Sequence, residues 1–140
     1  MVGLKGRFGQ RVRRLLRSER VIWLTTMGPD GTPQPRPVWF VWEKARGTLL
    51  IYSQPGSHKL KHLARNRRVA VHFNTDEEGA FVVVMTGTAR IDRKATPANR
   101  RADYVRKYRA AMRDLDMTPA SFAQAYAVPI RVRLQRARGG

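Results

Sequence analysis

The alternation of apolar and polar residues along the chain predicts a protein built mainly from β-strands. Apolar residues recur at every second position, or in short β-branched runs, in six separate segments. The six predicted strands cover Val21–Met27, Pro35–Glu43, Thr48–Ser53, Val69–Asn74, Phe81–Ile91 and Ile130–Gln135. Because tight turns separate the first three, we expect that part of the sheet to be antiparallel.

Proline and glycine mark special positions in two of these strands. Pro35 and Pro37 stand at the start of the second strand, and proline has no N–H to donate to a neighbour. That start must therefore lie at a sheet edge, at a bulge or against a ligand. Gly87, inside the fifth strand, predicts a bulge or a close approach of another backbone.

Apolar residues at three- and four-residue spacing predict helices outside the strands. A Ser or Thr followed by a turn of good helix formers, or by proline at the first helical position, indicates where several of them begin. The predicted helices cover Leu4–Leu16 with an arginine-rich outer face, a short segment after Ser57, Pro97–Met112 and a short segment from Pro119. We expect the tail, residues 136–140, to be loose.

These elements predict a mainly β (α+β) fold. Six short antiparallel strands commonly close into a barrel, with helices covering its ends. A length of 140 residues suits a single domain with a core of its own. We therefore expect one domain over residues 1–140, a six-stranded antiparallel barrel with peripheral helices.

Composition and charge narrow the possible functions. The absence of cysteine excludes disulfides and thiolate metal sites, and no apolar run is long enough to span a membrane. Without an apolar leader segment, a cytoplasmic location is expected. The net charge of +18, from 28 basic and 10 acidic residues, attracts polyanions. The basic residues are dispersed and match no nucleic-acid-binding motif, so no specific nucleic-acid partner is expected.

The sequence contains few candidate catalytic or metal-binding residues. His58 and His62 stand four residues apart on one predicted helix and could share a face, but nothing nearby supplies a third metal ligand. We therefore expect no metal site. No nucleophile with a neighbouring base forms a recognisable motif, so no catalytic side chain is assigned. If the protein is an enzyme, a bound cofactor carries the chemistry.

The turn that follows the third strand is the strongest candidate for a binding site. Its polar residues are donors without an intervening Asp or Glu: Ser53, Gln54, Ser57, Lys59 and Lys61. A helix that begins there would direct its free N–H groups and the positive end of its dipole at an anion. Two interpretations stay open at this point: a cofactor phosphate binds there, or the helix is amphipathic with a solvated basic face.

Four strings, in this order and spacing, resemble the pyridoxamine 5'-phosphate oxidase-like split β-barrel superfamily: LTTMGPDGTPQPRPVWFVW, LLIYSQPGSHKLKHLARNRRVAVHF, VVVMTGTARI and VPIRVRLQRARG. More narrowly, the chain resembles the small actinobacterial branch that uses the deazaflavin F420 or, in some members, FMN. The resemblance implies a homodimer with the cofactor at the subunit interface and a small-molecule substrate.

The resemblance also implies roles for individual residues. A strand would run along the cofactor ring, largely through its backbone, at Arg36, Pro37, Val38, Trp39 and Phe40. A second segment would hold the phosphate and the ribityl-like chain, through Ser53, Gln54, Ser57, His58, Lys59 and Lys61. Of these, Lys59 is the expected phosphate cation, followed by Lys61.

The chain departs from the true oxidases at its C-terminal end, which lacks their Arg-x-Trp motif. This departure argues against pyridoxamine-phosphate oxidase activity. The strongly positive charge favours F420, which is more anionic than FMN. The sequence thus predicts an F420H2-dependent reductase that moves a hydride between the deazaflavin and a small organic substrate. The alternatives are an FMN-dependent oxidoreductase and a non-catalytic flavin or F420 carrier.

Overall fold

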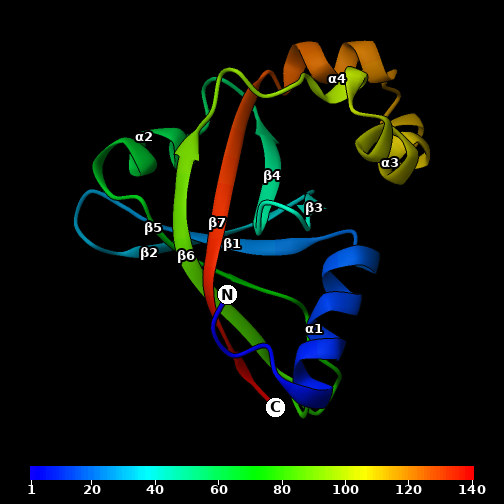
Figure 1. The fold of residues 1–140 in the computed structure, drawn as a ribbon. Coiled ribbons are helices and arrows are strands. Elements are labelled where there is room, and N and C mark those ends of the chain that lie inside the picture. The colour runs from blue at the N-terminus through cyan, green and yellow to red at the C-terminus, as the bar shows by residue number, and fades with distance from the viewer.

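One seven-stranded sheet organises the computed structural model, which describes residues 1–140 (Figure 1). The strands are β1 (Ile22–Met27), β2 (Pro33–Val38), β3 (Val41–Glu43), β4 (Thr48–Ser53), β5 (Arg68–His72), β6 (Val83–Ile91) and β7 (Val128–Gly139). The helices are α1 (Gly6–Ser18), α2 (His58–Arg65), the 3-10 helix η1 (Ala98–Arg100), α3 (Ala102–Asp114) and α4 (Pro119–Ala125). Every strand pair is antiparallel. The mainly β class with peripheral helices is therefore confirmed, with seven strands instead of six.

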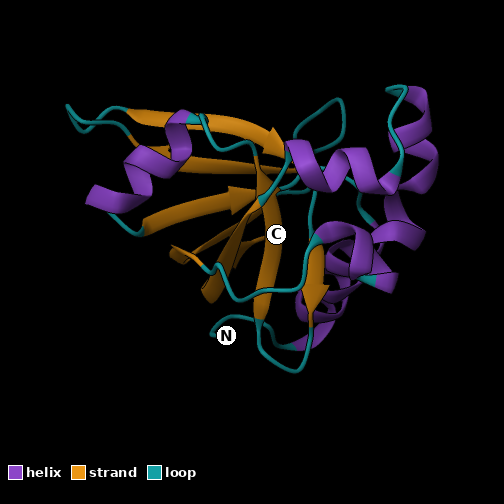
Figure 2. Ribbon diagram, turned by 90° about the horizontal axis from the view of Figure 1, so that it is seen from above, coloured by secondary structure: helices purple, strands orange, loops and turns teal.

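The order of the strands shows how the sheet closes. Along the sheet the order is β2-β1-β5-β6-β7-β4-β3, so β2 and β3 form opposite edges although they are consecutive in the chain. The three backbone steps from Val38 to Val41 span at most ~11 Å. The two edges must therefore approach each other, and the sheet curls into a half-barrel, as the view from above shows (Figure 2).

The predicted strand Pro35–Glu43 is wrong as a single element, because it divides between the two edges. Its first part pairs with β1 and its last part with β4. At the junction Phe40 is fully buried, and its backbone N–H donates to the Tyr108 hydroxyl (2.8 Å). Its carbonyl accepts from Lys107 Nζ (2.8 Å). Side chains of α3 thus replace the ladder partners that an unbroken strand would have had.

Pro35 and Pro37 lie on β2, an edge strand with β1 as its only neighbour, opposite Thr25 and Trp23. The edge interpretation of these prolines is confirmed. Gly87 marks a shift of register between β6 and β7, as predicted. A Cβ at Gly87 would lie 1.9 Å from the Arg133 carbonyl oxygen, so only glycine allows the two backbones to approach this closely.

Two further predictions from the sequence are wrong. The tail is ordered in β7, which pairs with β6 as far as Gly139. The helix predicted from Pro97 to Met112 is interrupted at Arg101, whose backbone is extended (φ −88°, ψ 106°). At this interruption the Arg101 side chain pairs with Glu43 (2.7 Å). The start of α4 is as predicted, with Thr118 accepting from Ser121 N–H and Pro119 at the first helical position.

The core has two parts. The larger lies within the curled sheet and includes Val12 and Leu16 of α1 and Leu49 and Ile51 of β4. The smaller lies on the other face of β4, where Leu50 and Tyr52 pack against η1, α3 and α4. Its buried residues are Val41, Leu50, Tyr52, Ala98, Tyr104, Tyr108, Met112 and Phe122. The outer face of β4 is thus covered by helices at the Tyr52 end. None of the helices combines the length and apolar character that crossing a membrane requires.

Candidate functional site

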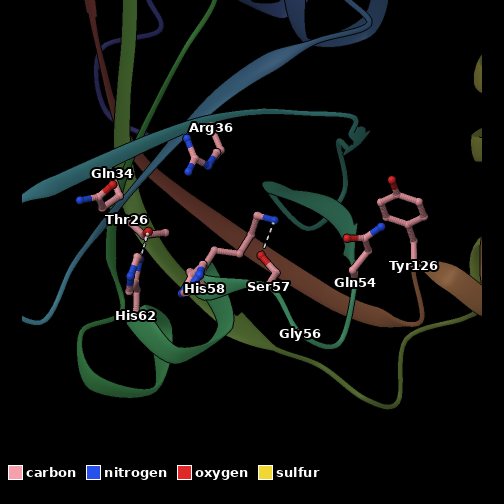
Figure 3. Close-up of a pocket in the computed structure, with 10 residues that line it drawn as sticks. Thr26, Gln34, Arg36, Gln54, Gly56, Ser57, His58, His62 and Tyr126 are labelled. Carbon is pink, nitrogen blue, oxygen red and sulfur yellow. Dashed lines mark hydrogen bonds between the residues drawn. The ribbon is translucent and has the colours of Figure 1, made fainter.

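Polar side chains from three parts of the fold surround a cavity of about 610 Å³ (Figure 3). They come from β1 and β2, from the turn and helix after β4, and from the end of α4. The lining residues are Thr26, Gln34, Arg36, Gln54, Gly56, Ser57, His58, Lys59, His62 and Tyr126. No Asp or Glu is among them, so the cavity has a positive potential and is suited to an anion.

Strand register explains the wall that β1 and β2 provide. Thr26 lies opposite Gln34, and side chains two residues apart on a strand share a face, so Gln34 and Arg36 lie together. Figure 3 shows these side chains above α2, facing the cavity. Thr26 is buried and is held by His62, whose Nδ1 lies 2.8 Å from Thr26 Oγ1. This contact fixes α2 to the sheet at the cavity wall.

Lys59 is the central cation of the cavity. It is half-buried, and its Nζ donates to Ser57 Oγ across 2.9 Å. Ser57 occupies the N-cap position of α2 but makes no side-chain capping bond. Burial lowers the pKa of Lys59, and the positive charge of Arg36 lowers it further. An anion bound between these two side chains would relieve their repulsion.

A second, mostly apolar cavity of about 230 Å³ adjoins the first. Its walls are Pro37, Val38, Trp39, Tyr52, Lys59, Tyr104, Leu115, Phe122 and Tyr126. Lys59 and Tyr126 line both cavities, so the two are contiguous. Together they form one elongated site with a basic end and an aromatic end.

Stacked rings give the aromatic end its shape. The Trp39 ring stacks on Tyr108, with centroids 4.6 Å apart, and on Phe122 at 5.3 Å. Phe122 in turn stacks on Tyr126 at 4.4 Å. Parallel rings at these distances restrain one another's rotation, so the wall is rigid before any ligand binds.

The structure brings most of the residues predicted from the sequence to this site. Arg36, Gln54, Ser57, His58 and Lys59 line the polar cavity, and Pro37, Val38 and Trp39 line the apolar one. Three predicted residues lie elsewhere. Phe40 and Ser53 are buried, and the Ser53 hydroxyl donates to the Gln54 carbonyl oxygen (3.0 Å). Lys61 is exposed and lines neither cavity.

Thr26, Gln34, Gly56, His62 and Tyr126 also line the cavity but are not among the cofactor-binding residues predicted from the sequence. The two-residue spacing of Gln34 and Arg36 on one strand could have indicated Gln34. The position of Thr26 depends on the register of β1 against β2, which places it opposite Gln34 and which the turn between them does not by itself determine. No three His, Asp or Glu side chains come together in a way that could hold a metal ion.

The curled antiparallel sheet with its peripheral helices defines a split β-barrel fold. Residues 8–137 match the family model described as pyridoxamine 5'-phosphate oxidase, and the chain belongs to that family. None of the curated proteins matches the chain in sequence.

Solved structures share this fold at low sequence identity. An F420 reductase superposes with a TM-score of 0.66 at 22% identity, covering 90% of this chain and 94% of its own. A putative pyridoxamine 5'-phosphate oxidase from Listeria innocua gives 0.64 at 20% identity, with coverage of 93% and 95%. The heme storage protein HutZ from Vibrio cholerae gives 0.65 at 13% identity, with coverage of 96% and 95%. One fold therefore serves different ligands, and function has to be argued from the site.

Proposed function

We propose that the protein is an F420H2-dependent reductase that transfers a hydride between the deazaflavin and a small organic substrate. The observation that carries this proposal is the junction of a basic and an aromatic cavity at Lys59 and Tyr126. A deazaflavin cofactor has the same division, with a planar ring at one end and a phosphodiester at the other.

The basic cavity suits the phosphodiester. Lys59 and Arg36 supply positive charge, while Ser57 and Gln54 supply neutral polar atoms. Charge-assisted hydrogen bonds to phosphate oxygens are stronger than neutral ones, and the partly buried Lys59 is less screened by solvent than a surface lysine. In this assignment Lys59 binds the phosphate, as its position on α2 favours.

The apolar cavity suits the ring. The backbone from Pro37 to Trp39 forms one wall, and proline at position 37 has no N–H that would be left without a partner there. The rings of Trp39, Phe122 and Tyr126 supply flat apolar surface, which excludes water from the place where the hydride moves.

The cofactor, when bound, supplies the hydride chemistry. The protein contributes to catalysis by orienting the ring and keeping water away from it, and no side chain is assigned a covalent role. We further propose a cytoplasmic homodimer, with each cofactor at the subunit interface. The exposed position of β2 at the sheet edge is compatible with a second subunit there.

The experiment that tests this function is a parallel titration with F420 and FMN, followed by fluorescence and absorbance. We expect F420 to bind at least ~10-fold more tightly, which corresponds to ~1.4 kcal/mol, because its tail adds negative charge near a wholly non-acidic wall. Copurification of FMN, with a yellow protein, would favour the FMN-dependent alternative.

Hydride transfer is tested separately from binding. Reduced F420 is mixed with the protein and a panel of enones, quinones and nitroaromatic compounds, and oxidation of the cofactor is followed by its absorbance. Turnover of at least one acceptor supports the reductase. Tight F420 binding without any turnover would instead indicate a carrier.

A further inference from the structure

A second basic cavity lies apart from the cofactor site. It has a volume of about 380 Å³, and its lining residues are Arg46, Thr48, Arg67, Thr88, Ala89, Arg90, Arg131 and Arg133. None of them lines the candidate site. We call its five arginines, Arg46, Arg67, Arg90, Arg131 and Arg133, the arginine groove.

Sheet register explains how this groove forms. Arg133 of β7 lies opposite Thr48 of β4 on one side and opposite Thr88 of β6 on the other. Two residues earlier on β7, Arg131 lies opposite Arg90. Arg90, Arg131 and Arg133 therefore share the outer face of the sheet, beyond the part of that face that α3 and α4 cover. Arg46, in the turn before β4, and Arg67, just before β5, complete the groove from the ends of these strands.

The buried end of the groove is rigid. The Arg131 side chain is only 8% exposed and makes a bidentate ion pair with Glu43, with both N–O distances 2.8 Å. Its third nitrogen pairs with Asp92. Because these acceptors hold the guanidinium in place and compensate its charge, Arg131 forms a fixed floor of the groove.

Three of the five arginines have no acidic partner. Arg90 is not one of them, because it pairs with Asp92 at 3.4 Å, an acceptor that it shares with Arg131. The side chains of Arg46, Arg67 and Arg133 make no ion pair and no hydrogen bond, and no acidic residue lines the cavity. Like charges gathered around one cavity repel one another, so an anion that binds among them is stabilised and in turn stabilises the folded protein.

We propose that the arginine groove binds a compact polyphosphate, a chain of two or three phosphate groups, either free or as the end of a nucleotide. Guanidinium groups match phosphate in geometry and can bind it with two parallel hydrogen bonds. The Thr88 hydroxyl, which has no partner, adds a neutral donor. The groove is a bounded cavity on one sheet face, which favours a short anion over a long polymer.

The test is calorimetric titration of the whole protein with tripolyphosphate. We compare the wild type with the double variant Arg46→Gln/Arg133→Gln, both sites being exposed. The matched control is Arg109→Gln/Arg113→Gln, which removes the same charge from exposed positions on α3 that make no ion pair. Saturable 1:1 binding that weakens at least ~10-fold in the groove variant, and less than ~2-fold in the control, supports the site. Absence of saturable binding, or an equal loss in both variants, overturns it.

Titrations with other anions distinguish a free polyphosphate from a nucleotide and from other ligands. ATP binding as tightly as tripolyphosphate supports a site for the phosphate chain alone, and tighter ATP binding supports a nucleotide. Citrate binding equally well would overturn the preference for phosphate. A single-stranded oligonucleotide that displaces tripolyphosphate, with a steep salt dependence, would show a nucleic-acid surface instead. F420 affinity should be unchanged in the groove variant, so this proposal and the proposed function fail independently.

Discussion

The hydroxyl of Tyr108 accepts a hydrogen bond from the backbone N–H of Phe40 at 2.8 Å, across 68 positions of sequence. The same hydroxyl lies 2.6 Å from the Arg20 carbonyl oxygen, to which it donates. One side chain of α3 thus satisfies the backbone at the point where the chain leaves one edge of the sheet for the other.

Replacing Tyr108 with Phe should therefore destabilise the protein by ~1–3 kcal/mol, since a buried N–H and a carbonyl lose their partner. Tyr104→Phe is the matched control: it lies one helical turn away and is fully buried, but its hydroxyl has no partner. Its removal should leave the free energy of unfolding unchanged or raise it. Urea denaturation of both variants checks this, and equal losses would contradict the role assigned to Tyr108.

This contact also shows why the sequence predicted the class of fold but not the number of strands. The sequence Pro35–Glu43 shows no break, because its apolar residues run without interruption from Val38 to Trp42. The break at Phe40 depends on Tyr108 and Lys107, which reach it only in the folded chain. Similarly, the order of the tail comes from its pairing with β6, and its arginine-rich sequence carries no strand pattern of its own.

Gly87→Ala should cost at least ~1–3 kcal/mol, because the new Cβ would lie 1.9 Å from the Arg133 carbonyl oxygen and neither backbone can move freely. Gly56→Ala is the control for the loss of glycine itself, since a Cβ there meets no atom within 4 Å. Thermal unfolding should show a lower midpoint for the first variant alone. A wild-type midpoint for Gly87→Ala would rule out the close packing of β6 on β7.

Glu43 is buried, with a side chain 8% exposed, and it binds both Arg101 (2.7 Å) and Arg131 (2.8 Å). Glu43→Gln should destabilise the protein by ~3–5 kcal/mol, because it leaves two arginines without their shared counter-ion. Glu77→Gln is the control. Glu77 lies in an exposed loop between β5 and β6, so this variant removes the same charge and should leave the free energy of unfolding nearly unchanged. Denaturation curves at neutral pH compare the two, and similar small losses would contradict a structural role for the network.

The pH dependence of stability tests the same network in the wild type. Burial would by itself raise the pKa of Glu43, but hydrogen bonds from Arg131 and Arg101 outweigh it and lower the pKa to about 2. The group binds fewer protons in the folded than in the unfolded state, where the value is 4.5. Its stabilisation is therefore complete above that value and is lost as the pH falls towards 2. In the Glu43→Gln variant, the free energy of unfolding should depend less on pH between 4.5 and about 2.

Some residues of the candidate site could be predicted from the sequence, but the direction of each side chain could not. The donor-rich turn indicated Ser57 and Lys59, and the family resemblance added His58; all three line one cavity. The resemblance ranked Lys59 before Lys61 but assigned both to the phosphate, since both are lysines near the helix start. Helix geometry separates them, because residues two apart point in different directions, and only Lys59 lines the cavity.

Lys59→Ala should weaken F420 binding by at least ~10-fold, because a phosphate would lose its partly buried cation. Lys44→Ala removes a lysine from an exposed turn outside both cavities and should leave the affinity unchanged. Fluorescence titration at fixed ionic strength measures both. An unaltered dissociation constant for Lys59→Ala would mean that the phosphate binds elsewhere.

Lys59→Arg provides the sharpest test, because it changes how the cation titrates while keeping its charge. Burial and then the charge of Arg36 lower the pKa of Lys59, so its ammonium is lost at a lower pH than that of a free lysine. A bound phosphate favours the charged form, so F420 affinity should fall as the pH rises through this pKa, and binding at a pH where the free lysine is partly neutral should take up a proton. Arginine stays charged throughout, so the variant should show neither effect. Calorimetry in buffers of different ionisation enthalpy measures the proton uptake, and identical uptake by both proteins would assign the proton to another group.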